Sequence, residues 1–251
     1  MRKRYKKTFL KKVVARVDFA SPVESLQKKL PPAVNAALLK VFPILESKKA
    51  VGKEFTIGPQ ETEERTFEQM NWYYYSKDRQ KRACLSFEFF WVEYNVYSSF
   101  EQLKADFLPI LEELFKSIQQ LQIKRFGLRY IDHIDFDEKD VFEWSDYLHE
   151  LLLAAFSIPH EGKQIIRTFN NFTVSDEDMI LQFQYGMYNP DFPAPIKKKL
   201  FVLDSDAYTQ GLLELSDIQA KLEKFHEAIG SLFEQVITDK LREKMGTINA
   251  N

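Results

Sequence analysis

Four side chains have the types and the spacing that could form a binding site: Arg129, His133, Asp204 and Asp206. The segment IKRFGLRYIDHID (residues 123–135) alternates apolar and polar residues, which predicts a β-strand. Arg129 and His133 are four residues apart in it, so they share one face. Asp204 and Asp206 are two residues apart in a second predicted strand and also share a face. If the strands are neighbours, one polar sheet face holds two cationic groups and two carboxylates.

Two kinds of chemistry fit such a face. Its cations could bind a small anionic ligand, and its two aspartates could supply the hard oxygen ligands that divalent metals prefer. The alternative is a solvent-facing antiparallel sheet with cross-strand ion pairs, which is a common arrangement. Other polar pairs on predicted strands would extend this face in either case: Arg125 with Asp135, Arg167 with Asn171, and Gln182 with Gln184.

No other pattern in the sequence points to a catalytic or cofactor site. The phosphate-loop, dinucleotide, zinc-protease and serine-hydrolase motifs are missing, and no cofactor is predicted. The four histidines, at positions 133, 149, 160 and 226, are never three or four residues apart, so a histidine metal site would need distant elements. We expect His226 to be a satisfied core or edge histidine and the other two outside the strand to lie at the surface. Cys84, the single cysteine, reads as core packing.

Composition sets broad limits on function. The 251 residues carry a formal net charge of −2, which gives the whole molecule no bias toward nucleic acid or acidic membranes. No stretch is long and apolar enough to cross a bilayer, and no secretory segment follows the basic start. The sequence therefore predicts a cytoplasmic protein that is not bound to a membrane.

The first twelve residues, MRKRYKKTFLKK, are strongly basic. One interpretation is an arm that binds nucleic acid or anionic lipid. The other is a frayed, solvated terminus that is dispensable for folding, as chain termini commonly are.

Periodicity and capping patterns predict alternating strands and helices. Capping boxes, in which a serine precedes Glu or Gln by three residues, occur at residues 21–24, 99–102 and 216–219. The expected strands are residues 13–19, 55–57, 65–75, 83–94, 123–135, 164–174, 179–188 and 200–208. The expected helices are residues 21–30, 33–42, 99–118, 142–156 and 216–245.

This order predicts an α+β fold with two layers, a mostly antiparallel sheet and helices packed on one face. The elements repeat as strand, helix, two or three strands and helix, which indicates a pseudo-duplication with halves at about 9–120 and 121–245. No linker separates the halves, so we expect residues 1–251 to form a single domain.

The segment FGLRYID (residues 126–132) resembles the central glRYiN-type motif of a sporadically distributed bacterial family without assigned biochemistry. The likeness extends to the first strand and Phe42–Pro43, to FVLDSD at 201–206, and to the closing ITDKLREKM at 237–245, similar to the family's ITxxLRxxM helix. It covers most of the chain. Two features depart from the family pattern: TFLKK replaces a proline pair and an acidic residue before the first strand, and Asp132 replaces the usual asparagine. The resemblance implies a bacterial protein and brings no catalytic residues.

Three hypotheses of function follow. The first is a non-enzymatic binding or assembly module that forms a homodimer, with the last helix offering one side to the sheet and the other to a second subunit. The second is a divalent-metal-dependent enzyme acting on a phosphorylated or nucleotide substrate, built on Asp204, Asp206, Arg129 and His133. The third and weakest is nucleic-acid binding through the basic arm, with the aromatic residues 72–75 available for base stacking.

Overall fold

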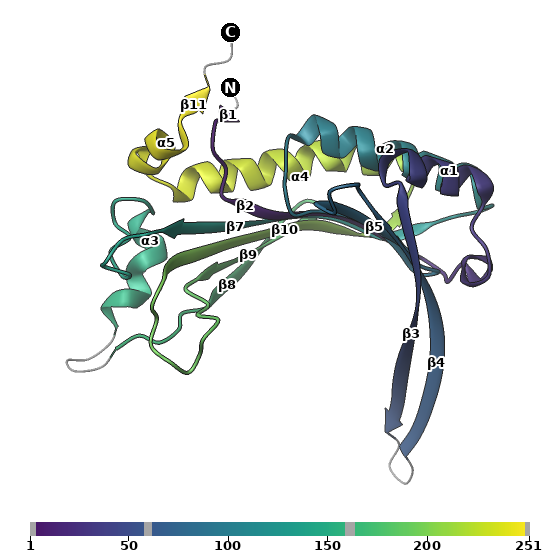
Figure 1. The fold of residues 1–251 in the computed structure, drawn as a ribbon, viewed down its shortest axis with the longest axis horizontal. Helices are drawn as coiled ribbons and strands as arrows, with labels where there is room; N and C mark the ends of the chain where they lie inside the picture. The colour runs from purple at the N-terminus through teal and green to yellow at the C-terminus, as the bar shows by residue number, and fades with distance from the viewer. Residues whose placement is uncertain (1–3, 58–61, 159–163, 249–251) are drawn as a thin grey trace. The chain divides into compact units, whose positions relative to one another are not determined.

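Residues 4–57, 62–158 and 164–248, which the computed structural model describes, fold into an α+β structure (Figure 1). In these residues a mostly antiparallel nine-stranded sheet is accompanied by a separate two-stranded sheet and five α-helices. The predicted fold class is therefore confirmed. None of the helices in this part of the chain combines the length and the apolar composition that a membrane span requires.

The strands of the large sheet follow an order that differs from their order in the sequence. In space they are β3 (Ile44–Ile57), β4 (Thr62–Tyr75), β5 (Lys81–Leu85), β6 (Phe89–Tyr94), β2 (Leu10–Phe19), β7 (Ile123–Phe136), β10 (Lys199–Leu213), β9 (Met179–Gly186) and β8 (Asn170–Asp176). The small sheet pairs β1 (Arg4–Tyr5) with β11 (Thr247–Ile248). The helices are α1 (Pro32–Val41), α2 (Phe100–Ser117), α3 (Glu150–Leu153), α4 (Leu215–Val236) and α5 (Asp239–Met245), with 3-10 turns at Glu24–Gln27 and Ala154–Ser157.

The chain divides into two compact units. Unit 1 consists of Met1–Val13, Arg129–Tyr208 and Lys224–Asn251, and unit 2 consists of Val14–Leu128 and Thr209–Glu223. Strands β2, β7 and β10 and helix α4 contribute to both units, because the boundaries fall inside them. The sequence-based view of one domain with repeated halves stays a prediction.

In unit 2, helices α1 and α2 lie against one face of the strands (Figure 1). Helix α2 begins as its capping box predicts, because the Ser99 side chain accepts a hydrogen bond from the Gln102 backbone N–H at 3.1 Å. The rings of Phe90, Phe107 and Phe126 stack in succession between helix and sheet, at centroid distances of 5.6 and 6.1 Å. All three rings are fully buried, so the stack is part of the unit 2 core.

One carboxylate is buried in this core with a full set of partners. Asp106 of α2 is 5% exposed. It accepts hydrogen bonds from the Tyr94 hydroxyl at 2.5 Å and the Gln102 side-chain amide at 2.6 Å, and it pairs with the Lys81 ammonium at 3.1 Å. The network therefore links α2 to both β5 and β6.

In unit 1, the central strand β7 shows the predicted alternation. Tyr130 and Ile134 are buried, and the Tyr130 hydroxyl lies 2.8 Å from Nδ1 of the buried His226 on α4. Asp132 has the same parity as these residues and is 8% exposed. No hydrogen bond or ion pair to its carboxyl group is formed within the described residues. Burial, helped by the charge of Asp204, raises the pKa of Asp132 from 3.8 to about 7.

The rest of the unit 1 core is aromatic and aliphatic. Trp144 is fully buried, and its ring lies 5.4 Å from that of Phe201 on β10. Several residues of α4 and α5 join this cluster, including Val236, Leu241 and Met245. The core thus connects the sheet to the carboxyl-terminal helices.

The strand predicted at 83–94 is wrong, because the chain reverses at residues 86–88 to give β5 and β6. These two strands pair antiparallel, with Leu85 opposite Phe90, and the Ser86 N–H donates to the Phe89 carbonyl at 2.9 Å. The turn contains no Gly, Pro or Asn, so the apolar run hides it in the sequence.

Two helix predictions are also wrong. Residues 21–30 contain only the 3-10 turn Glu24–Gln27, with no side-chain cap, although Leu26 and Leu30 are buried as expected. Most of residues 142–156 is irregular, and helix is limited to α3 and the turn after it; Leu151, expected inside, is 72% exposed. A β-bridge between Leu148 and Ile237 uses backbone groups that a longer helix would need.

The single helix predicted for 216–245 is interrupted between α4 and α5. The Thr238 backbone N–H donates to the Tyr147 carbonyl at 3.1 Å instead of continuing the helix. The Thr238 side chain then caps α5 by accepting a hydrogen bond from the Leu241 N–H at 3.3 Å. The interruption lets α5 turn against the unit 1 core.

The described part of the basic terminus is docked, so the prediction of a frayed arm is wrong for it. The backbone N–H groups of Lys6 and Lys7 donate to the carbonyls of Gly246 and Met245, at 2.9 and 3.0 Å. The Tyr5 hydroxyl donates to Glu234 at 2.5 Å. Removing the first seven residues would break these bonds. That these residues are dispensable for folding stays a prediction. Residues 1–3 lie outside the described part.

Candidate binding site

The structure brings two of the four predicted site residues into direct contact. Nε of Arg129 donates to Oδ1 of Asp204 at 2.8 Å, and Nη2 donates to Oδ2 at 2.6 Å. Asp204 is buried, whereas 45% of the Arg129 side chain is exposed. This bidentate geometry fixes both groups and is the strongest form of an arginine–carboxylate pair.

The other two predicted residues, Asp206 and His133, interact with this pair through electrostatic charge. Asp206 lies two residues further along β10, opposite Gln182 of β9, and its charge helps to raise the pKa of Arg129. Partial burial and Lys11 lower the pKa of His133, and the charge of Asp204 opposes this decrease. The polar face predicted from alternation is therefore present in unit 1, with Gln184 opposite Asp204 on the next strand.

Sequence reasoning did not single out Tyr188, which borders this face. Its hydroxyl is buried and, within the described residues, has no hydrogen-bond partner. Burial and the charge of Asp204 raise the pKa of Tyr188 to about 12, against the opposing effect of Arg129 and Arg167. The hydroxyl stays protonated and available as a donor near the Arg129–Asp204 pair.

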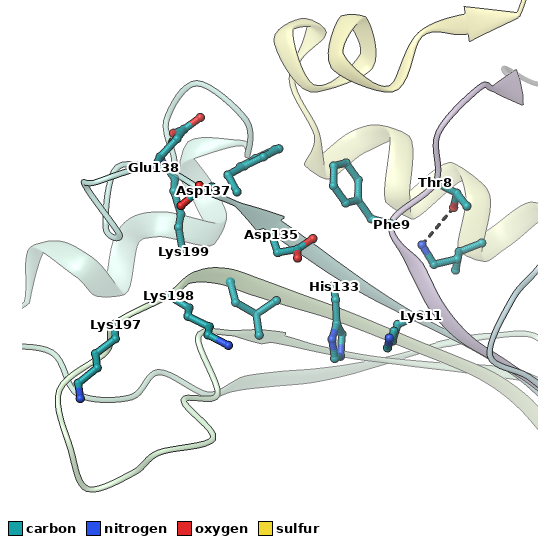
Figure 2. A pocket seen from close by; sticks show the side chains of 13 residues that line it. Thr8, Phe9, Lys11, His133, Asp135, Asp137, Glu138, Lys197, Lys198 and Lys199 are labelled. Atoms are coloured by element: carbon teal, nitrogen blue, oxygen red, sulfur yellow. Dashed lines mark hydrogen bonds and ion pairs between the residues drawn. The ribbon is translucent and has the colours of Figure 1, made fainter.

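A pocket of about 600 Å³ lies in unit 1 where β2 and β10 begin and β7 ends (Figure 2). One of the four predicted residues, His133, lines it. The remaining lining residues come from three segments: Thr8, Phe9, Leu10 and Lys11; Asp135, Phe136, Asp137 and Glu138; and Lys197, Lys198, Lys199 and Leu200. The backbone N–H of His133 donates to the Phe9 carbonyl at 2.9 Å, which fixes the first two segments to each other.

One wall of the pocket is rigid. The Lys199 side chain is only 2% exposed, and its ammonium pairs with Glu138 at 2.7 Å. It also lies over the rings of Trp144 and Tyr147, at 5.2 and 5.3 Å from their centroids. Hydrogen bonds from Lys199, Tyr147 and Lys244 lower the pKa of Glu138 to about 2. Lys199 and Glu138 are therefore both held by interactions within the protein.

The other cations of the pocket are differently placed. Lys11, Lys197 and Lys198 are exposed, and no residue in the described part of the chain forms an ion pair with them. Lys11 lies next to His133, and Lys198 extends toward both, whereas Lys197 points away (Figure 2). Lys11 and His133 are therefore close neighbours, and Lys198 lines the same pocket.

The groups around His133 change the pKa of its imidazole ring. Partial burial and the nearby Lys11 lower its pKa below the ordinary value of 6.5, and Asp135 and Asp204 counteract this only in part. A pKa below 6.5 leaves the ring mainly neutral at pH 7. A bound anion would favour the imidazolium and raise this pKa.

The remaining histidines and the cysteine behave as structural residues where they are described. His226 is hydrogen-bonded in the core as expected, and exposed His149 caps α3 by accepting from the Leu151 N–H at 3.3 Å. His160 lies outside the described residues. Cys84 is buried, and burial raises its pKa to about 12, which agrees with the predicted core role. No cluster of three or more His, Cys, Asp or Glu side chains within the described ranges could hold a metal ion.

The lysines of the pocket were missed by sequence reasoning. The signal was the run Lys197–Lys199 after a proline-rich loop, at the start of a strand whose neighbour carries His133. Its relation to Lys11 depends on the spatial order of β2, β7 and β10, which spacing in the sequence does not reveal.

Compared with known protein families, curated proteins and solved structures, the chain has no match. The resemblance to the glRYiN-type family therefore stays a prediction, and the argument about function depends on the geometry of unit 1.

Proposed function

We propose that this protein is a non-enzymatic binding module that holds a small phosphorylated ligand in the pocket at the ends of β2, β7 and β10. The observation that carries the proposal is that Lys11, His133 and Lys198 all line one pocket of about 600 Å³. Small-molecule sites in proteins have volumes of roughly 300–1,000 Å³, so the pocket has the size of such a site.

A phosphate monoester suits these groups. It carries a charge of about −1.5 to −2 at pH 7 and offers three acceptor oxygens, whereas each lysine brings a full charge and three donors. Neutral His133 can donate one further hydrogen bond and can gain a proton when the anion arrives. The ligand charge would thus be balanced without breaking the Lys199–Glu138 pair.

The rest of the lining suggests what else the ligand carries. Asp135 and Asp137 line the same pocket, and carboxylates accept hydrogen bonds from hydroxyl groups. Phe9 and Phe136 form an apolar corner, with their rings edge to face at 5.7 Å. A phosphorylated polyol or sugar with an apolar or ring-shaped part would contact all three kinds of surface.

Binding without turnover is the better reading of the polar groups nearby. Both carboxylate oxygens of Asp204 accept from Arg129, so one of the two aspartates that the metal-enzyme hypothesis needed is already engaged in an ion pair. The Glu138 carboxylate is likewise engaged by Lys199 and Lys244. A phosphorylated ligand also agrees with the cytoplasmic location proposed from the sequence, since phosphorylated metabolites are intracellular compounds.

Calorimetric titration with inorganic phosphate, ribose 5-phosphate and ribose tests this function. Wild-type protein should bind ribose 5-phosphate more tightly than phosphate and should not bind ribose. Lys11→Glu and Lys198→Glu should each weaken binding about tenfold, the effect of losing one charge-assisted contact. The control Lys77→Glu, an equal charge change at an exposed turn outside the pocket, should leave affinity unchanged. Equal weakening by all three variants, or no binding of either phosphate, would overturn the proposal.

Protonation of His133 gives a second readout. Because an anion raises a histidine pKa that is lowered in the free protein, binding takes up a proton and tightens as the pH falls below 7. Sulfate is the suitable probe, since its charge is constant between pH 5 and 8. His133→Gln should remove the pH dependence of sulfate affinity while the contribution of Lys198 persists.

A further inference from the structure

The large sheet ends in two edge strands of different character. Strand β8 pairs with β9 along its full length, from Asn170 opposite Tyr185 to Asp176 opposite Met179. On its other side it has no partner strand among the described residues. An edge strand of this kind presents a row of backbone N–H and C=O groups that can pair with another chain.

The other edge strand, β3, carries the protection that proteins commonly use. Its described portion contains Glu46, Lys48 and Lys49, and Lys49 pairs with Glu68 on β4 at 3.0 Å. Charged side chains, lysine above all, discourage another strand from approaching such an edge. Strand β8, NNFTVSD, has no lysine, arginine or proline, and its only charge is at the last residue.

Strand β8 also exposes apolar side chains. Phe172 and Val174 are 42% and 47% exposed, although they point to the same face as the buried Phe183 and Leu181 that oppose them on β9. Phe169, just before the strand, is 51% exposed. A sheet extended past β8 would cover this strip with further side chains.

We propose that β8 pairs antiparallel with β8 of a second copy of this chain, which makes the large sheet continuous through a homodimer. The proposal is independent of the phosphate pocket, whose residues lie on other strands. It assigns the homodimer expected from the sequence to the sheet edge rather than to α4, where Phe233 already packs against the unit 1 core.

The sequence of β8 is complementary to itself in one register. A two-fold axis at Thr173 pairs all seven residues, so that Phe172 of each copy lies opposite Val174 of the other. Asn170 lies opposite Asp176 of the second copy, which sets an amide donor against a carboxylate. No like charges oppose each other, and the aromatic and β-branched pairs are among the favourable cross-strand neighbours.

Paired substitutions at two exposed positions test both the dimer and its register. In Phe172→Lys/Val174→Lys, each new ammonium would face another across the axis, and association should weaken about 100-fold. In Phe172→Lys/Val174→Glu, each ammonium would face a carboxylate of the second copy, and association should be restored in low salt. The control Leu45→Lys, on the other edge, should leave the dimer intact.

Light scattering over a dilution series, with circular dichroism to check folding, measures these outcomes. A dimeric wild type, a monomeric Lys/Lys variant and a dimeric Lys/Glu variant are the expected results. A wild type that stays monomeric at high concentration overturns the proposal. So does a Lys/Lys variant that dimerises as strongly as wild type, or a Lys/Glu variant that is folded and as dissociated as the Lys/Lys variant.

Discussion

Asp106 in unit 2 and Asp132 in unit 1 are buried to a similar degree, at 5% and 8% exposed, but their surroundings differ. Asp106 accepts hydrogen bonds from Tyr94 and Gln102 and pairs with Lys81. Asp132 has no hydrogen bond or ion pair within the described residues, and burial, with the charge of Asp204, raises its pKa to about 7. One group acts as a structural anion and the other as a carboxylic acid near its titration point.

The difference shows that partners, rather than depth, decide what a buried carboxyl group does. Removing a carboxylate from water costs several kcal/mol, and only hydrogen bonds and a counter-charge offset the cost. Unit 2 supplies them from two strands and its own helix. In unit 1 the Asp132 carboxyl group has no such partners among the described residues. It reduces the free-energy cost of burial by binding a proton. Substitutions of Asp106 and Asp132 should therefore change the free energy of unfolding in opposite directions.

The largest effect is expected for Asp106→Ala. The substitution leaves the Lys81 ammonium and the Tyr94 hydroxyl without their shared acceptor, and breaking such a buried pair costs about 3–5 kcal/mol. Urea unfolding at pH 7 measures the change in the free energy of unfolding. A loss below about 1 kcal/mol, the size of a surface ion pair, would mean that the network contributes little.

A smaller effect of opposite sign is expected for Asp132→Asn. Because the folded pKa is raised from 3.8 to about 7, the favourable contribution of this carboxyl group is complete below pH 3.8 and is lost as the pH rises to 7. The full shift corresponds to roughly 4 kcal/mol, and partial hydration should reduce the gain in the variant at pH 8 to about 2 kcal/mol.

Comparing unfolding of wild type and Asp132→Asn from pH 4 to pH 8 checks this sign. The variant should become progressively more stable relative to wild type as the pH rises, with no further change above pH 8. A pH-independent difference would show that Asp132 titrates at an ordinary pKa in the folded protein.

The smallest effect is expected for Glu138→Gln, at the pocket wall. Its pKa is lowered from 4.5 to about 2 by hydrogen bonds from Lys199, Tyr147 and Lys244, so its stabilising contribution is present above pH 4.5 and is lost as the pH falls toward 2. The variant should be less stable than wild type at pH 7, and the difference should vanish in acid. Acid titration followed by circular dichroism measures it; a difference that persists at pH 2 would assign it to packing instead.

Much of the fold follows from local pattern. Alternation in residues 123–135 predicted β7 and both of its faces, and the capping box at Ser99 predicted the start of α2. Two of the failures, the helices predicted at 142–156 and 216–245, come from competition by distant backbone groups. Tyr147 accepts from the Thr238 N–H across the fold and so interrupts the last helix, and no local signal in the sequence announces that bond.

The candidate site was predictable only in part for the same reason. Parity placed Arg129 and His133 on one face of their strand and Asp204 and Asp206 on one face of theirs, since the period of a strand is a local property. The pairing of Arg129 with Asp204 depends on β7 and β10 being neighbours, and the pocket depends on β2 joining them. Asp132 shows a further limit: its parity assigned it to the apolar side, but only the packed structure reveals that it lacks partners there.

The Lys199 ammonium above Trp144 gives the molecule a built-in optical probe. Trp144 is the only tryptophan in unit 1, whereas Trp72 and Trp91 belong to unit 2, so its emission can be isolated by replacing those two with phenylalanine. A charge 5.2 Å from an indole ring shifts its excited state, and the same lysine lines the pocket. The fluorescence of one buried ring can therefore follow, in a single titration, both what enters the pocket and when unit 1 unfolds.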